Sequence, residues 1–317
     1  MPRHPFYSLH RERRSLSFAS GPEPFGTPSL YRHMFFEDVA IGIMPLGGQF
    51  RPARLRVTLD PSDDERAKLI GEALHHGRDS DLADGLCDFL RRVGSRVCEE
   101  DTALYEIVYL REKPDGPPVA FELVALDNEQ LVRRRRKWFQ VIPAEVARRH
   151  KTGPQIHLPE DSLMTFTLPK LWRSRVRDAR ETLGRLGDPG FFGLNIEAQK
   201  AGISYDFQEH QRHLNLALAE VGRSLGWTAR GSFNGEVLSY TWIRMQLKFE
   251  RFKIQLREAL LDELNAGLRK VGATMGFSAT IKLDGLPTEN SVESALRDLH
   301  EGKMAFTEVM RKFEGQA

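Results

Sequence analysis

The feature that most constrains the fold of this chain is an unbroken helical pattern from Ser239 to Lys270. The stretch contains no proline, and its first glycine is Gly267. Apolar side chains recur in it at steps of three and four residues, so one face of the predicted helix is apolar. We expect Ser239 to cap its start and Gly272 to end it. At about 1.5 Å per residue, such a rod can brace a large domain or lie between subunits.

The composition is that of an ordinary folded protein, with 40% hydrophobic and 28% charged residues among 317. Because the formal net charge is only +2, any contact with nucleic acid has to come from a local basic patch. The two cysteines, Cys87 and Cys98, form no disulfide framework and no closed zinc site. We expect both to be buried thiols in a reducing compartment. We find no apolar run long enough to span a membrane and no secretory signal.

Local patterns predict an α+β chain that is mainly helical. Residues 1–53 are rich in Pro, Gly, Ser, Arg and aromatic residues, which predicts an extended arm. Its aromatic side chains would pack on a neighbouring subunit, or the arm is a partly disordered tail. Two strand-like runs, Ala103–Leu110 and Val119–Leu126, flank a Pro-Asp-Gly turn and predict a β-hairpin.

Capping patterns predict where two helices begin. Ser62 and Glu65 form a capping-box pattern that opens a helix to about His76, and Ser80 or Asp81 opens a second one. The other predicted elements are strands at 54–59, 155–158, 163–168 and 277–283, and helices at 82–97, 170–186 and 207–225. A closing helix is expected to start at Thr288, Asn290 or Ser291 and to end near Phe313.

The most basic stretch runs from Arg133 to Lys151 and has eight Lys or Arg residues against one acidic residue, Glu145. A charge run is usually a solvated surface, but clustered Arg and Lys also suit contact with phosphate groups. Trp138 and Phe139 would either stack on bases or pack in a small core. The basic residues are Arg133, Arg134, Arg135, Arg136, Lys137, Arg148, Arg149 and Lys151.

The sequence contains few signs of an active site. Glu209, His210 and His213 lie close together on a predicted helix, but not in the H-E-x-x-H order that places two imidazoles for zinc. No dinucleotide-binding, Walker A or G-x-S-x-G motif is present. We therefore expect a role in binding or assembly, without enzymatic activity, cofactor or metal. A metal-dependent hydrolase that uses His210 and His213 is one alternative, and a monomeric or dimeric nucleic-acid-binding protein that uses 133–151 is the other.

Three segments, taken in order, resemble those of a known family. The first is the helix and hairpin DLADGLCDFLRRVGSRVCEEDTALYEIVYLREKPDGPPVAFELVALDNEQLVR. The second is QIHLPEDSLMTFTLPK with the basic helix after it, and the third is FQEHQRHLNLALAEVGRSLGW followed by MQLKFERFKIQLREALLDELNAGL. Over about Arg54 to Phe313, this order is similar to that of the portal proteins of tailed bacteriophages and gene transfer agents.

The resemblance implies a ring of about twelve subunits around a channel for double-stranded DNA, at one vertex of a capsid. Such a ring is assembled in the host cytoplasm and becomes part of the virion. It contacts the major capsid protein, docks the large subunit of the terminase during packaging, retains the genome and seats the head–tail connector. Contact with DNA would involve the backbone without sequence specificity, because any sequence has to pass. No membrane is involved.

The resemblance also assigns a role to each segment. A wing would contain the long helix near 239–270, and a small β-rich clip would meet the motor and connector. The outgoing stem helix, at 127–137, would be very short, and a crown would be minimal or absent. The remaining assignments are an N-terminal arm at 1–53, the wing at 54–126 and 205–317, the returning stem at 170–187, the clip at 138–169 and a tunnel loop at 188–204.

Three groups of residues would act in such a ring. In the tunnel loop, Asn195, Gln199 and Lys200 would be the polar groups near DNA. The basic residues of 133–151 would contact the motor, the connector or the adjacent subunit. Basic and acidic helix faces would pair between subunits in a closed head-to-tail ring. The basic members of these faces are Arg173, Arg177, Arg180, Arg244, Lys248 and Arg251.

Overall fold

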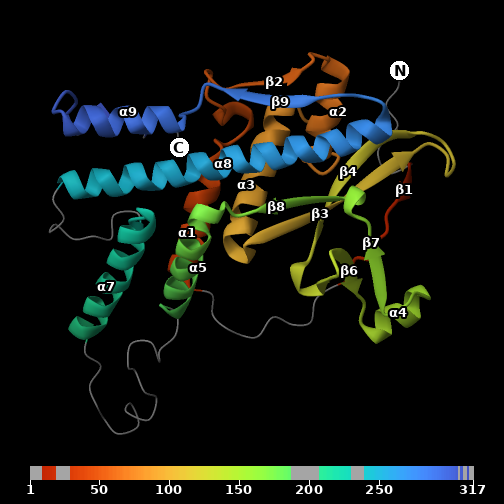
Figure 1. The fold of residues 1–317 in the computed structure, drawn as a ribbon, viewed down its shortest axis with the longest axis horizontal. Helices are drawn as coiled ribbons and strands as arrows, with labels where there is room; N and C mark the ends of the chain where they lie inside the picture. The colour runs from red at the N-terminus through yellow and green to blue at the C-terminus, as the bar shows by residue number, and fades with distance from the viewer. Residues whose placement is uncertain are drawn as a thin grey trace, which may run out of the picture. The chain divides into compact units, whose positions relative to one another are not determined.

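A computed structural model of the chain describes residues 9–18, 29–186, 207–229, 239–305, 308, 309 and 313. This part of the chain is α+β and mainly helical, as the sequence predicts (Figure 1). The chain divides into two compact units. The first unit comprises Met1–Pro24, Leu46–Thr167 and Ala259–Gly285, and the second comprises Phe25–Pro45, Leu168–Glu258 and Leu286–Ala317.

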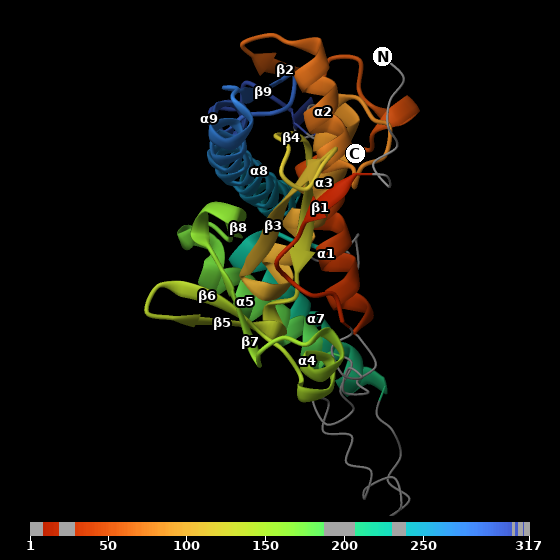
Figure 2. The same cartoon turned by 90° about the vertical axis from the view of Figure 1, so that its right-hand side faces the viewer.

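The first unit is built on an antiparallel sheet whose central strand is β3 (Thr102–Arg111). The neighbour along one edge is β4 (Pro118–Leu126), which confirms the predicted hairpin. The other edge of β3 is shared by β8 (Leu163–Thr167) and β1 (His10–Glu12), which pair with its first and last residues respectively (Figure 2). The sheet therefore joins segments from three distant parts of the sequence.

Two helices, α2 (Asp64–Leu74) and α3 (Leu82–Glu100), pack on each other and on this sheet. Asp81 caps α3 as predicted, but the predicted capping box at Ser62 is wrong. Asp63 caps α2 instead, because its carboxylate accepts a hydrogen bond from the backbone N–H of Arg66. The two helices approach closely at glycines, since a Cβ on Gly85 would lie only 2.3 Å from a carbonyl oxygen of α2.

A small three-stranded sheet contains β5 (Leu131–Arg134), β6 (Lys137–Val141) and β7 (Gln155–Leu158), with α4 (Ala144–His150) between the last two. The helix expected at 127–137 is therefore wrong, because this segment forms a short 3-10 turn and a hairpin. Arg135 and Arg136 form the two-residue turn with positive φ values of 49° and 67°. A tight hairpin requires that conformation, although arginine seldom adopts it.

The second unit is helical in the residues that the structure describes. The extended arm predicted for 1–53 is wrong at α1, where the Phe35 ring packs 5.5 Å from Trp227 and 6.4 Å from Phe249. These aromatic side chains gain their buried surface within their own chain. The helices of this unit are α1 (Leu30–Ile43), α5 (Lys170–Arg185), α7 (Phe207–Leu225), the first part of α8 (Ser239–Met275) and α9 (Glu289–His300).

The predicted long helix is present as α8, but it continues past Gly272. Gly272 lacks a side chain where the carbonyl oxygen of Phe277 approaches, and a Cβ there would lie 2.2 Å from that oxygen. The helix ends at Met275, and the next residue, Gly276, has a φ of 76° that suits glycine. The chain then forms β9 (Thr280–Asp284), which pairs with β2 (Arg56–Asp60).

The closing helix, α9, starts at the predicted Thr288 cap but ends at His300, well before the expected Phe313. Gly302, with φ of 68°, lets the backbone turn back, and the N–H of Lys303 then bonds the carbonyl oxygen of Asp298. In the described residues, no helix combines the length and apolar character needed to cross a membrane.

We predict that Phe89→Ala lowers the free energy of unfolding by about 3–5 kcal/mol, since the Phe89 ring is 1% exposed and touches two other buried aromatic rings. Urea unfolding followed by circular dichroism measures this change. Phe50→Ala, at a ring that is 67% exposed in the same unit, is the matched control and should change stability by less than about 0.5 kcal/mol. Equal losses in the two variants would contradict the assigned core.

Candidate nucleic-acid interface

The structure separates the basic stretch 133–151 into two groups. Residues 133–137 form the tip of the β5–β6 hairpin, while Arg148, Arg149 and Lys151 lie at the end of α4. Strand β6 begins at the hairpin tip and leads towards α4, so the two groups flank opposite ends of this strand (Figure 2). The run that is continuous in sequence is thus two basic surfaces on one small sheet. We call them the hairpin group and the helix group.

The hairpin group is exposed, and its aromatic neighbour anchors it to the sheet. The guanidinium of Arg133 lies 5.4 Å from the centre of the Trp138 ring, a cation–π contact. Trp138 packs in turn on a small core that includes Leu126 and Leu158. The centre of the Phe139 ring lies 5.3 Å from that of the His157 ring, and the two rings are tilted by 48°. Both aromatic side chains therefore serve the sheet, which supports packing in a small core over stacking on bases.

The helix group has one local electrostatic role. Arg148 donates from Nε to the carbonyl oxygen of Ala144, and the last turn of α4 contains Arg148, Arg149 and His150. Cations are favourable there because the carbonyl groups at the end of a helix carry partial negative charge. The guanidinium of Arg149 remains exposed to solvent. All three basic side chains of the helix group are exposed, so they remain accessible to a partner while they stabilise the end of α4.

Within the described residues, none of the eight basic side chains in the two groups forms an ion pair. Other arginines of the same unit do, as shown by Arg51 with Asp81 at 2.8 Å and Arg111 with Glu12 at 2.8 Å. Acidic residues therefore form ion pairs with arginines elsewhere in this unit, but among the described residues they form none with the basic side chains of the small sheet. An exposed surface with several uncompensated guanidinium groups attracts phosphate or an acidic protein surface.

The basic residues predicted to lie between subunits are engaged within their own chain. Arg251 forms an ion pair with Glu289 and is also 3.5 Å from Glu293, while the Lys248 ammonium donates to the carbonyl oxygen of Arg223. Burial lowers the pKa of Lys248, and the positive charges of Arg175 and Arg244 lower it further. The Arg173 guanidinium donates to the carbonyl oxygen of Leu168, and interactions inside the chain also occupy Arg177, Arg180 and Arg244.

Two other sets of predicted residues lie wholly or partly outside the residues that the structure describes. Asn195, Gln199 and Lys200 lie outside the described residues. His210 and His213 both lie on α7, but the side chain of His210 is also outside them. No cluster of three or more His, Cys, Asp or Glu side chains that could hold a metal occurs in the described part.

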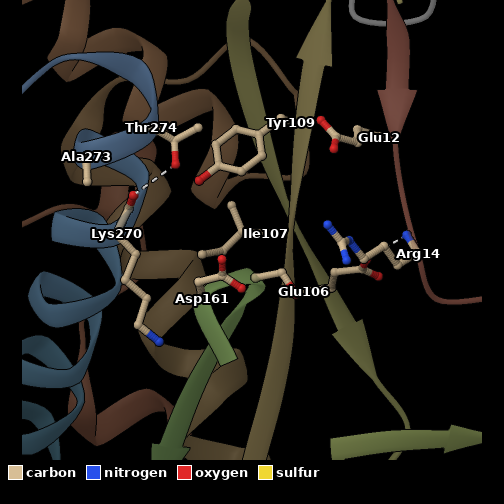
Figure 3. Close-up of a pocket in the computed structure, with 10 residues that line it drawn as sticks. Glu12, Arg14, Glu106, Ile107, Tyr109, Asp161, Lys270, Ala273 and Thr274 are labelled. Atoms are coloured by element: carbon tan, nitrogen blue, oxygen red, sulfur yellow. Dashed lines mark hydrogen bonds between the residues drawn. The ribbon is translucent and has the colours of Figure 1, made fainter. Parts of the chain in front are cut away.

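A recess of about 390 Å³ in the first unit is the polar cavity that the sequence did not reveal (Figure 3). Its walls come from β3, from the segment that follows β1, and from the end of α8. Buried Glu106 accepts hydrogen bonds from the backbone N–H groups of Arg14 and Ser15, and the Lys270 ammonium donates to the carbonyl oxygens of Glu160 and Leu163. These polar groups hold the walls together, so they are not free to act on a ligand.

Tyr109 is the phenol that lines this recess, and it is unsuited to proton transfer near neutral pH. Its ring points towards the Thr274 hydroxyl in Figure 3. Burial raises the pKa of Tyr109, and the hydrogen bond to Thr274 offsets this only in part. The phenol therefore stays protonated at physiological pH. The recess contains polar groups but no arrangement that would activate a nucleophile.

Neither models of known protein families nor the curated proteins give a match to this chain. Evidence on function therefore comes from the surfaces of the protein itself. The most unusual of these is the pair of basic groups, because their charge is exposed and uncompensated within the described residues.

The two cysteines are buried and neither forms a disulfide, as predicted. Burial raises the pKa of Cys87 to about 12, because the thiolate is poorly solvated there. We predict that Ellman's reagent at pH 8 reacts with neither thiol in the folded protein and with both in urea. Rapid reaction of the folded protein would show that the first unit opens at α3, and free glutathione under the same conditions controls for the reagent.

Proposed function

We propose that this chain is a portal-type subunit that forms a ring around a channel for double-stranded DNA at a capsid vertex. The observation that carries the proposal is the uncompensated basic surface on the small sheet β5–β6–β7. This sheet lies in the chain between the hairpin β3–β4 and the helix α5, where the family resemblance expects a clip. The protein would act by assembly and contact, without catalysis, and would reside in the virion.

The order of the elements also supports the proposal. Helix α3 and the hairpin β3–β4 come first, the small β-rich sheet follows, and then come a basic helix, α5, and the long helix α8. The resemblance implies the order wing, outgoing stem, clip, returning stem and wing, and the elements fit that order except at the outgoing stem. The segment 127–137 departs from it, because it forms a hairpin strand where an outgoing stem helix was expected.

The electrostatics suit a ring that transports DNA. Contacts to phosphate carry no sequence information, and repetition around a ring multiplies a weak patch. Each contact has to stay weak, because DNA must slide. The basic groups would also serve protein contacts with the terminase large subunit and later with the connector, through acidic surfaces on those partners. The major capsid protein would surround the ring.

The uncompensated basic groups equally favour one alternative, a monomeric or dimeric protein that binds nucleic acid directly. A free protein that neutralises several phosphates loses affinity steeply as salt rises, by roughly 0.9 in log K per log salt for each contact. Subunit number and salt dependence therefore separate the two functions.

We predict that the purified protein forms rings with a central hole, at high concentration or with the scaffold that drives shell assembly. Light scattering gives the mass, and negative-stain class averages give the symmetry. If the protein stays monomeric or dimeric under all these conditions and binds DNA, the result would contradict the ring and favour the alternative function.

We predict that reversing the hairpin charge, with Arg134→Glu and Arg135→Glu together, impairs ring assembly or docking of the motor and connector. The protomer should remain folded, because both side chains are exposed and stability should change by less than about 0.5 kcal/mol per site. The matched control is Arg54→Glu with Arg269→Glu, two exposed arginines of the same unit. Unchanged assembly and DNA packaging in the hairpin variant would remove the role given to this group.

A further inference from the structure

A small cavity in the second unit lies where the end of α1 meets α8. Its volume is about 50 Å³, and Gly42, Lys253, Arg257, Pro287 and Phe313 are among the residues that line it. All of them belong to the second unit. We call it the cation cavity, because two of its wall residues carry positive charge in a mostly apolar setting.

Both cations are nearly withdrawn from solvent. Lys253 is 9% exposed and Arg257 is 5% exposed. Lys253 has a compensating carboxylate, since its ammonium lies 2.6 Å from Glu250. Arg257 forms no ion pair with any residue that the structure describes. The cavity wall therefore contains two positive charges and one negative charge.

The hydrogen bonds of Arg257 leave much of its donor capacity unused. Its guanidinium donates to the carbonyl oxygens of Pro287 and Ile43, the latter at 3.5 Å. A guanidinium has five N–H groups and cannot lose its charge in a protein. Burial lowers the pKa of Arg257, and the negative charges of Glu258 and Glu250 offset this only in part. An unpaired buried cation is costly unless an anion compensates it.

Part of this arrangement has a purely structural explanation. Ile43 is the last residue of α1, and a cation near its carbonyl oxygen stabilises the end of that helix. That accounts for one contact of Arg257. It does not account for a second buried cation beside the same cavity.

The fold makes specific room for that second cation. A Cβ on Gly42 would lie 2.2 Å from Cδ of Lys253, so the lysine stem crosses α1 where that helix has no side chain. The ammonium then lies 4.8 Å from the centre of the Phe249 ring. Helix α1, the aromatic ring and Glu250 together fix Lys253 at the cavity.

We propose that the cation cavity binds one small anion, of the class of chloride and short carboxylates, between Arg257 and Lys253. The size selects this class, because one water molecule needs roughly 10–15 Å³ of such space and a cavity of about 50 Å³ therefore has room for only a few heavy atoms. A nucleotide or a sugar acid is too large. Binding here would stabilise the second unit, and it does not depend on whether the protein forms a ring.

Thermal unfolding of the full chain in three sodium salts at matched ionic strength tests the proposal. Chloride and formate should raise the melting temperature in a saturable way that follows ln(1 + [L]/Kd), while gluconate, an anion too large for the cavity, should not. Equal effects of all three salts would reflect general screening and would overturn the proposal. A rise with formate but not chloride would identify a carboxylate site.

The matched variants are Arg257→Gln and Arg269→Gln, the second at an exposed arginine on the same helix. Arg257→Gln should weaken the anion-specific response at least about tenfold, because it removes a charge-assisted contact, and the control should keep the response in full. An unchanged response in Arg257→Gln would overturn the proposal.

If Arg257→Gln does not fold, ³⁵Cl NMR on the unaltered protein decides. Chloride line broadening that formate abolishes and gluconate leaves intact supports the site. Chloride lines that the protein does not broaden, together with a melting temperature that formate does not raise, would refute it.

Discussion

The burial of one face of α8 is the interaction on which the rest of the structure depends. Phe252, Leu256, Leu260, Leu264 and Leu268 follow at intervals of four residues, and each is 0% exposed. The first part of this helix belongs to the second unit and the last part to the first unit, so one apolar stripe supplies both cores. Full burial of each such side chain contributes roughly 1.5–3 kcal/mol, so the stripe is a substantial contribution to folding.

Polar groups on the same helix fix the strands around it. Within the first unit, Glu263 accepts hydrogen bonds from the backbone N–H and the hydroxyl of Thr167, at the end of β8. Asn265 exchanges two hydrogen bonds with the backbone of Ile281 in β9. Because these bonds are directional, they set the position of each strand where apolar contacts alone would permit sliding. Polar and charged residues of this long helix therefore have roles within the chain, and its charge does not require that every one of them binds another protein or DNA.

Arginine serves two distinct purposes in this chain. Arg257 and Arg251 are held by carbonyl or carboxylate oxygens inside their unit, where they tie helices and loops together. The arginines at the tip of the β5–β6 hairpin have no such partners among the described residues, and they face solvent. This contrast, more than the total charge, supports the proposed role of the small sheet in contact with polyanions or acidic proteins. In the cation cavity, the buried Arg257 still lacks an ion-pair partner among the residues that the structure describes.

The sequence by itself determined the elements that depend on local patterns: α8, the hairpin β3–β4, the Asp81 cap and α7, because periodicity and capping act within a few residues. Only the tertiary structure decided that 127–137 pairs as a strand, that α1 forms in a Pro- and Gly-rich region, and that the basic run splits into two groups. For α1 the partner is distant in sequence, as Trp227 is for Phe35. The hairpin at 131–141 is local, but its second strand also pairs with β7 beyond α4. The cation cavity is the clearest case: Lys253 and Arg257 are neighbours on α8, but they line a cavity only once α1 packs on that helix.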